Sequence, residues 1–150
     1  GAFMNGSRIH VDDKIHTVQK GLILTDPGYE RTPEGIAAMI SAYTKLLQHK
    51  VQALRIVGST VLSMAWVACG RANAFLIGLH NEGGKPWDYC AGTVICEEAG
   101  ATLIRLDSRT FVDPPGGTTS AFDVYSRSCI CAGSPELGAE MLSMITGTAS

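Results

Sequence analysis

The sequence lacks the features that mark several large classes of protein. Its 150 residues carry a formal net charge of only −2, so the charge balance does not favour nucleic acid or an anionic membrane as a partner. No apolar run approaches the roughly 20 residues that a membrane span needs. Residues 1–6 show no basic start followed by an apolar stretch, so we expect no signal peptide there.

Paired cysteines and zinc-type spacings are also missing. The five cysteines are an odd number, and four of them lie in apolar runs typical of helices or strands, which predicts reduced thiols and a cytoplasmic location. Cys129 and Cys131 share one face of an expected strand, and no second Cys or His pair lies nearby at zinc spacing, so we interpret both as core residues. Neither a helical His pair nor a Gly-x-Ser-x-Gly nucleophile elbow is present.

What the chain does contain is an alternation of strand and helix patterns. The apolar runs that predict strands cover residues 21–25, 53–57, 74–79, 101–106 and 128–132. We expect the run at 53–57 to be a central strand, and the Asn5-Gly6 dipeptide to close a hairpin near the start. The alternation predicts an α/β fold in which helices cover a sheet, in one domain over residues 1–150.

Two of the predicted helices have clear start signals. The first begins at Thr32-Pro33-Glu34, and its predicted buried face contains Ile36, Met39, Ile40, Tyr43, Leu46 and Leu47. The second begins at Gly58-Ser59-Thr60 and is closed by Gly70, with a predicted buried face of Leu62, Ala65, Trp66 and Cys69.

Two segments combine a helix start with chemically useful side chains. Asp88 lies at the start of a predicted helix, where capping is the commoner role of an aspartate. Gly58, Ser59 and Thr60 follow a strand and open a helix, an arrangement that can bind an oxyanion or a polyol, although Ser59 could equally serve as a cap. The sequence patterns alone leave both alternatives open.

A family resemblance favours the functional alternatives. The block Trp87-Asp88-Tyr89-Cys90-Ala91-Gly92, continuing to Gly100-Ala101, resembles the second motif of the inositol monophosphatase family of magnesium-dependent, lithium-sensitive phosphatases. Three further segments resemble that family in the right order, namely Gly1-Ala2-Phe3-Met4-Asn5-Gly6, Leu54-Arg55-Ile56-Val57-Gly58-Ser59-Thr60 and Phe122-Asp123-Val124-Tyr125-Ser126-Arg127. The resemblance implies a layered mixed sheet with covering helices, the C-terminal half of a sugar-phosphatase fold.

The resemblance also implies roles for particular residues. Asp88 would be a Mg²⁺ ligand and a catalytic residue that also borders the substrate, while Gly58, Ser59 and Thr60 would contact the substrate. Magnesium prefers hard oxygen ligands, which suits a carboxylate held at a helix end. The implied reaction is hydrolysis of a phosphate monoester, most closely inositol monophosphate, by a homodimer that needs no nucleic acid or membrane partner.

The other half of the family's active site is absent from these residues. The first motif of the family, Asp-Pro-[Ile/Leu]-Asp-Gly-Thr with an upstream glutamate, does not occur. The Asp113-Pro114-Pro115-Gly116 stretch follows the Asp88 block and has glycine in place of the second aspartate, so we interpret it as a loop. We therefore expect an incomplete chain that is inactive alone. The alternative is a non-catalytic family member that acts as a scaffold or dimerisation half.

One departure from the family concerns the substrate. Leu76 stands where the inositol phosphatases often carry a glutamate that contacts substrate hydroxyl groups. Either Glu82, in the longer loop that follows, takes over this contact, or the substrate differs.

Overall fold

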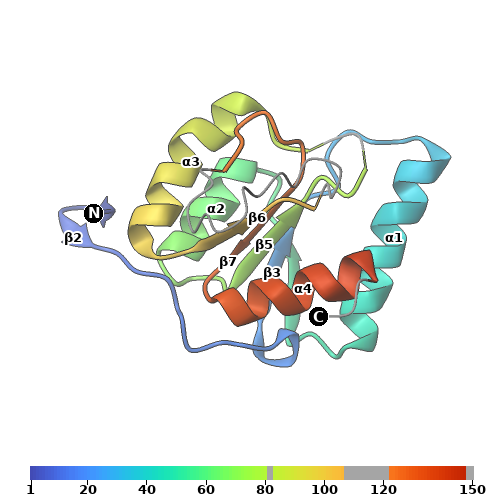
Figure 1. The fold of residues 1–150 in the computed structure, drawn as a ribbon, viewed down its shortest axis with the longest axis horizontal. Coiled ribbons are helices and arrows are strands. Elements are labelled where there is room, and N and C mark those ends of the chain that lie inside the picture. Colours follow the sequence, from blue (N-terminus) through green and yellow to red (C-terminus); the bar gives the residue numbers. More distant parts are fainter. Residues whose placement is uncertain (81–82, 107–121, 148–150) are drawn as a thin grey trace, which may run out of the picture.

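A computed structural model describes residues 1–80, 83–106 and 122–147 and shows a sheet between two layers of helices (Figure 1). Helices α2 (Thr60–Ala68) and α3 (Pro86–Ala99) pack on one face of the sheet. Helices α1 (Pro33–Gln48) and α4 (Pro135–Thr146) pack on the other face. The predicted α/β class and the layered arrangement are confirmed.

The main sheet has five strands in the order β4-β3-β5-β7-β6. Its strands are β3 (Leu22–Thr25), β4 (Ala53–Ile56), β5 (Ala74–Ile77), β6 (Thr102–Ile104) and β7 (Cys129–Ala132). Strand β3 pairs in parallel with both β4 and β5, whereas β7 runs antiparallel between β5 and β6, so the sheet is mixed.

The prediction that residues 53–57 form a central strand is wrong. Among the strands of the described residues, β4 lies at an edge of the sheet and pairs with β3 alone, and its residues Arg55 and Ile56 are exposed. A short apolar run does not distinguish a strand with two partners from one with a single partner, because that difference depends on where distant segments pair. The edge leaves unpaired backbone groups on the outer side of β4.

A short hairpin precedes the sheet. Strands β1 (Phe3–Met4) and β2 (Ser7–Arg8) pair antiparallel, and Asn5 and Gly6 between them have φ values of 52° and 82°. Positive φ at both turn positions is the geometry that the Asn-Gly dipeptide favours, so the predicted hairpin is confirmed. A single turn of 3₁₀ helix, Val18–Lys20, leads into β3.

Side chains on β7 alternate between the two apolar cores. Cys129 and Cys131 lie in the core beneath α2 and α3, whereas Ile130 lies in the core beneath α1 and α4. Burial raises the pKa of the Cys129 thiol, and the Sγ atoms of Cys131 and Cys96 are 3.5 Å apart. All five cysteines are free, and the interpretation of Cys129 and Cys131 as core residues on one strand face is confirmed.

The buried faces of the first two long helices differ from the predictions. On α1 the buried residues are Gly35, Ala42 and Leu46, while Ile40 is 54% exposed and Leu47 is 64% exposed. Apolar residues cover more of the circumference of α1 than the sheet and α4 can bury. The predicted start at Thr32 is confirmed, because the Thr32 side chain accepts a hydrogen bond from the Gly35 N–H.

The predicted face of α2 is right only in part, for a different reason. Its buried residues are Thr60, Ser63, Met64, Val67 and Ala68, and the predicted Leu62 is largely exposed. This helix is apolar almost all round, so periodicity does not select one face.

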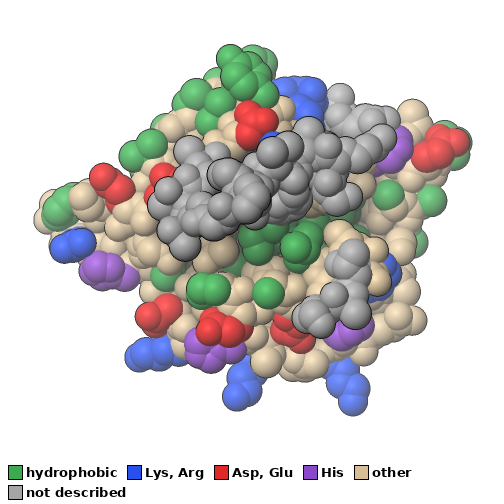
Figure 2. Space-filling view, in the orientation of Figure 1, with side chains coloured by type: hydrophobic (Ala, Val, Ile, Leu, Met, Phe, Trp, Pro, Cys, Tyr) green, Lys and Arg blue, Asp and Glu red, His purple; other side chains and the backbone are tan. Residues whose placement is uncertain are grey.

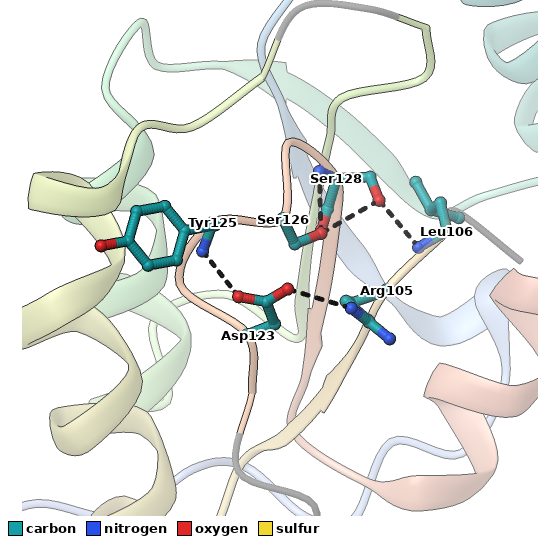
Figure 3. Close-up of polar contacts among 6 residues, drawn as sticks. All are labelled: Arg105, Leu106, Asp123, Tyr125, Ser126 and Ser128. Atoms are coloured by element: carbon teal, nitrogen blue, oxygen red, sulfur yellow. Dashed lines mark hydrogen bonds and ion pairs between the residues drawn. The ribbon is translucent and has the colours of Figure 1, made fainter. Parts of the chain in front are cut away.

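Polar contacts hold together the two segments that flank residues 107–121 (Figure 3). The Arg105 guanidinium lies 3.2 Å from the Asp123 carboxylate, and the Leu106 N–H donates to the Ser128 hydroxyl at 3.0 Å. The Ser126 hydroxyl donates to the carbonyl of Ser128 at 2.8 Å. These contacts fix the backbone that leads into β7. The Asp113 stretch lies outside the described residues.

No helix in the described part of the chain is both long enough and apolar enough to cross a bilayer. On the face shown in Figure 2, acidic, basic and histidine side chains are interspersed along the lower edge of the view. This face therefore shows no large patch of a single charge sign there.

The Asn73 side chain connects three segments at the N-terminal end of β5. Its Oδ1 atom accepts a hydrogen bond from the Leu22 N–H at 2.8 Å, and its Nδ2 donates to the Asp12 carboxylate at 3.2 Å. The backbone carbonyl of Asn73 accepts a hydrogen bond from the Gly133 N–H at 2.8 Å. Because Asn73 is buried, a partner lost here is not replaced by bulk water.

We expect Asn73→Ala to lower the free energy of unfolding by about 2 kcal/mol, because the Leu22 N–H would be left without its acceptor. Urea unfolding of the purified protein would measure this loss. Asp12→Ala leaves the Leu22 bond intact and removes the contacts of the Asp12 carboxylate with the Asn73 amide and the Lys14 N–H, so it should cost less. An equal loss of unfolding free energy in both variants would show that the hydrogen bond from the Leu22 N–H to Asn73 is not the main contribution.

Candidate functional site

The path of the chain leaves a crevice at the C-terminal ends of three strands. Helix α1 leads from β3 to β4 on one face of the sheet, and α2 leads from β4 back to β5 on the other face. Because β3 lies beside β4, the helices that follow these two strands leave their neighbouring C-terminal ends over opposite faces of the sheet. Open α/β sheets bind ligands at such switch points.

A cleft of about 450 Å³ lies at this position. It is bordered by the segments that follow β3, β4 and β5 and by the first turns of α2 and α3. The lining residues are Asp26, Gly28, Tyr29, Gly58, Ser59, Thr60, Ile77, Gly83, Lys85, Trp87 and Asp88. The structure thus brings together Gly58, Ser59, Thr60 and Asp88, the four residues that the sequence singled out.

The Gly58-Ser59-Thr60 segment forms the helical wall of the cleft. Ser59 is the N-cap of α2, and its hydroxyl accepts a hydrogen bond from the Leu62 N–H at 3.3 Å. The capping role is therefore present. It is compatible with ligand binding, because the other N–H groups of the first turn and the positive end of the helix dipole remain at the cleft.

Asp88 likewise combines a structural contact with a place in the cleft. Its Oδ2 atom accepts a hydrogen bond from the Lys85 N–H at 2.9 Å, which holds the carboxylate at the first turn of α3. A carboxylate has two oxygens and several acceptor sites, so this cap leaves capacity for a cation. The half-buried position of Asp88 keeps it accessible from the cleft.

Asp26 is a cleft residue that the sequence analysis did not single out. Its Oδ1 atom accepts a hydrogen bond from the Gly28 N–H at 2.9 Å, so it does shape the turn after β3. It also lines the same cleft as Asp88. The signal that could have identified it is its place directly after a buried strand, the same place that Gly58 takes after β4.

The cleft offers donors of the kind that magnesium prefers. Mg²⁺ in proteins is commonly held by one or two carboxylates, with waters and substrate phosphate completing its octahedron. Asp26 and Asp88 supply two carboxylates, and Ser59 and Thr60 supply hydroxyl oxygens. Within residues 1–80, 83–106 and 122–147, no three Asp, Glu, His or Cys side chains converge on one point. The residues present therefore fit part of a magnesium site.

Leu76 points away from the cleft. It is fully buried in the core beneath α1 and α4, while its neighbour Ile77 lines the cleft from the end of β5. A hydrophobic side chain in this core makes no contact with a ligand in the cleft. Glu82, the suggested replacement, lies outside the described residues.

The loop between β5 and α3 is held close to the segment before β7. Gly78 has φ of +79°, and a β-carbon there would overlap the carbonyl oxygen of Arg127. A β-carbon at Gly83 would overlap the same oxygen. The loop that leads to Asp88 thus depends on backbone packing that only glycine allows at these two positions.

The structure is that of an α/β domain with a cleft at its switch point that is lined by carboxylate and hydroxyl oxygens. The sequence model of the inositol monophosphatase family matches residues 1–146, and the chain belongs to this family.

Named relatives agree with this assignment. The chain is 36% identical over 137 residues to an inositol monophosphatase of Dictyostelium discoideum, covering 91% of this chain and 44% of the relative. It is 38% identical over 138 residues to inositol monophosphatase 1 of Solanum lycopersicum, again covering 91% of this chain and 44% of the relative. The solved inositol monophosphatase of Anabaena superposes with a TM-score of 0.73 at 25% identity, over 97% of this chain and 50% of that one. The chain spans half the length of these proteins or less.

We expect Gly78→Ala to destabilise the protein more than Gly6→Ala. Both glycines have positive φ, at 79° and 82°, so the strain of placing a β-carbon in the left-handed region is matched. Only the alanine at position 78 also overlaps the Arg127 carbonyl. This overlap should lower the free energy of unfolding by a further amount of about 1 to 3 kcal/mol. Thermal or urea unfolding of both variants gives the comparison, and equal losses would mean that the loop moves aside freely.

Proposed function

We propose that the protein containing this chain hydrolyses phosphate monoesters with magnesium, and that inositol monophosphate is its substrate. The observation that carries this proposal is the meeting of Asp26, Asp88 and the first turn of α2 in one cleft, within a chain of the inositol monophosphatase family. The names of its relatives support the substrate.

The cleft residues divide into two groups under this proposal. Asp88, and with it Asp26, would hold the cation, while Gly58, Ser59 and Thr60 would bind hydroxyl groups of the substrate through the α2 N-terminus. Magnesium, when bound, would polarise the phosphate and lower the pKa of a bound water. Leu76 makes no contribution to substrate recognition, because its side chain lies in the apolar core.

The homodimer and the cytoplasmic location belong to the same proposal. The open edge of β4 and the exposed apolar residues of α1 support pairing with another surface, since both are costly to leave in water. The free cysteines are consistent with a reducing compartment.

The second candidate is a non-catalytic member of the family that acts as a scaffold. The observation in its favour is that the described residues bring only Asp26 and Asp88, among acidic side chains, to the cleft. A panel of phosphate monoesters, assayed with magnesium and with or without lithium, separates the two candidates. Turnover by the full protein favours the enzyme, and its absence favours the scaffold.

We predict that Asp88→Asn nearly abolishes magnesium-dependent turnover and leaves the fold intact. Asparagine keeps a side-chain oxygen that can accept the Lys85 N–H, so the substitution removes the charge while preserving the cap. The measurement is phosphate release as a function of Mg²⁺, together with the melting temperature of the variant.

Glu34→Gln is the matched control for Asp88→Asn. Glu34 also lies in the first turn of a helix, α1, but it does not line the cleft. This variant should keep its turnover. Wild-type turnover by Asp88→Asn, or an equal loss in both variants, would exclude the assigned role of Asp88.

We also predict that residues 1–150 expressed alone release no phosphate from any monoester. Two carboxylates do not assemble the multi-metal site that the family resemblance implies, and the chain covers only 44% of its relatives. Robust turnover by the isolated chain, at the rate of the full protein, would contradict this expectation.

A further inference from the structure

Two loops that border the cleft are joined outside it by a contact between a histidine and a carboxylate. The Nδ1 atom of His80 lies 3.2 Å from Oε2 of Glu30, although the two residues are 50 positions apart. Glu30 belongs to the turn between β3 and α1, which carries Asp26. His80 belongs to the loop between β5 and α3, which leads to Asp88. Neither Glu30 nor His80 lines the cleft itself.

Contacts other than the one with His80 hold the Glu30 side chain in place. Its Oε1 atom accepts a hydrogen bond from the Thr32 N–H at 2.8 Å, and its side chain is only 12% exposed. Its methylene groups lie against Gly35, where a β-carbon would overlap them. Hydrogen bonds from Thr32, and after them the contact with His80, lower the pKa of Glu30 to about 2, so this carboxylate is ionised at neutral pH.

The pair spans a gap between the two loops. A small cavity of about 20 Å³ separates them, lined by Asp26, Pro27 and Glu30 on one side and by Gly78, Leu79 and His80 on the other. The imidazole therefore reaches across from one loop to the other. The far side of the β5–α3 loop is held against the Arg127 carbonyl, so the loop is fixed between Arg127 and Glu30.

We propose that the Glu30–His80 pair is a positioning device that sets the spacing of the two cleft walls, one carrying Asp26 and the other carrying Lys85 and Asp88. Under the proposed function both walls would hold the cation to which the substrate phosphate binds, so losing the pair would weaken substrate binding. The capped position of Asp88 on α3 does not depend on the pair, because the Lys85 N–H holds it. The kinetic part of this inference rests on the proposed function.

The kinetic test compares His80→Ala with His80→Asn in the full protein. Alanine removes the donor, and we expect KM for inositol monophosphate to rise about fivefold to tenfold while kcat changes less than about twofold. Asparagine carries an amide nitrogen near the position of Nδ1 and should recover most of the loss in KM. A loss confined to kcat, or failure of asparagine to improve on alanine, would overturn the proposal.

A double-mutant cycle tests the partner. Glu30→Ala should raise KM at least as much as His80→Ala, because it also removes the acceptor of the Thr32 N–H. Adding His80→Ala to Glu30→Ala should raise KM no further, because the contact between them is already lost. Full additivity of the two losses would overturn the pairing.

The chain provides a matched control pair away from the cleft. His16 and Glu136 form a similar contact, with Nδ1 and Oε2 3.3 Å apart, but both side chains are more than half exposed and neither borders the cleft. His16→Ala should leave KM unchanged. A rise in KM equal to that of His80→Ala would show a general stability effect and overturn the positioning role.

A readout independent of turnover separates this inference from the proposed function. In a Trp66→Phe background, Trp87 is the single tryptophan in the chain and lies on the cleft wall beside Asp88. We expect His80→Ala and Glu30→Ala to change acrylamide quenching of Trp87, and His80→Asn and His16→Ala to leave it near the parent value. Unchanged quenching in both alanine variants would overturn the proposal, whether or not the protein turns over monoesters. Absence of turnover with altered quenching would overturn only the proposed function.

Discussion

The placement of β3 between β4 and β5 is the constraint on which the rest of the structure depends. A strand in this position has parallel neighbours on both sides, so the chain must leave over one face of the sheet and return over the other. The two connecting helices, α1 and α2, then diverge from the same end of the sheet. The cleft is a direct result of that divergence, and the same geometry aims the start of α2 at it.

The cleft also depends on a part of the chain that does not line it. The contacts of Arg105, Asp123, Ser126 and Ser128 hold the backbone before β7 (Figure 3). That backbone places the Arg127 carbonyl against the glycines of the β5–α3 loop. Asp88 is held at the start of α3 by the Lys85 N–H. The loop before it contacts the Arg127 carbonyl at Gly78 and Gly83, and Glu30 in the turn after β3 through His80.

Sequence patterns predicted the features whose causes are local. The helix starts at Thr32 and Ser59 and the Asn5-Gly6 turn depend on residues a few positions apart, and the structure shows each where the pattern indicated it. The buried faces of α1 and α2 and the edge position of β4 depend on distant segments. The central position predicted for residues 53–57 was wrong, and the predicted faces were right only in part, since Leu46 is buried and Trp66 packs against the core.

The same distinction holds for the site. Asp88 and the residues after β4 could be found because a contiguous motif carries them. The place of Asp26 in the cleft and the Glu30–His80 contact are evident only in the folded structure, where the ends of three strands lie together. No local sequence pattern links positions 26, 30, 80 and 88.

The order of strands in the sheet has a consequence for how the chain folds. Among the described strands, β7 comes last in the sequence but pairs inside the sheet, between β5 and β6. During synthesis, the edges of β5 and β6 that will pair with β7 therefore remain unpaired until residues 129–132 have been made. Such long-range pairing slows folding, and the unpaired edges leave a nascent or truncated chain open to aggregation until β7 inserts between β5 and β6.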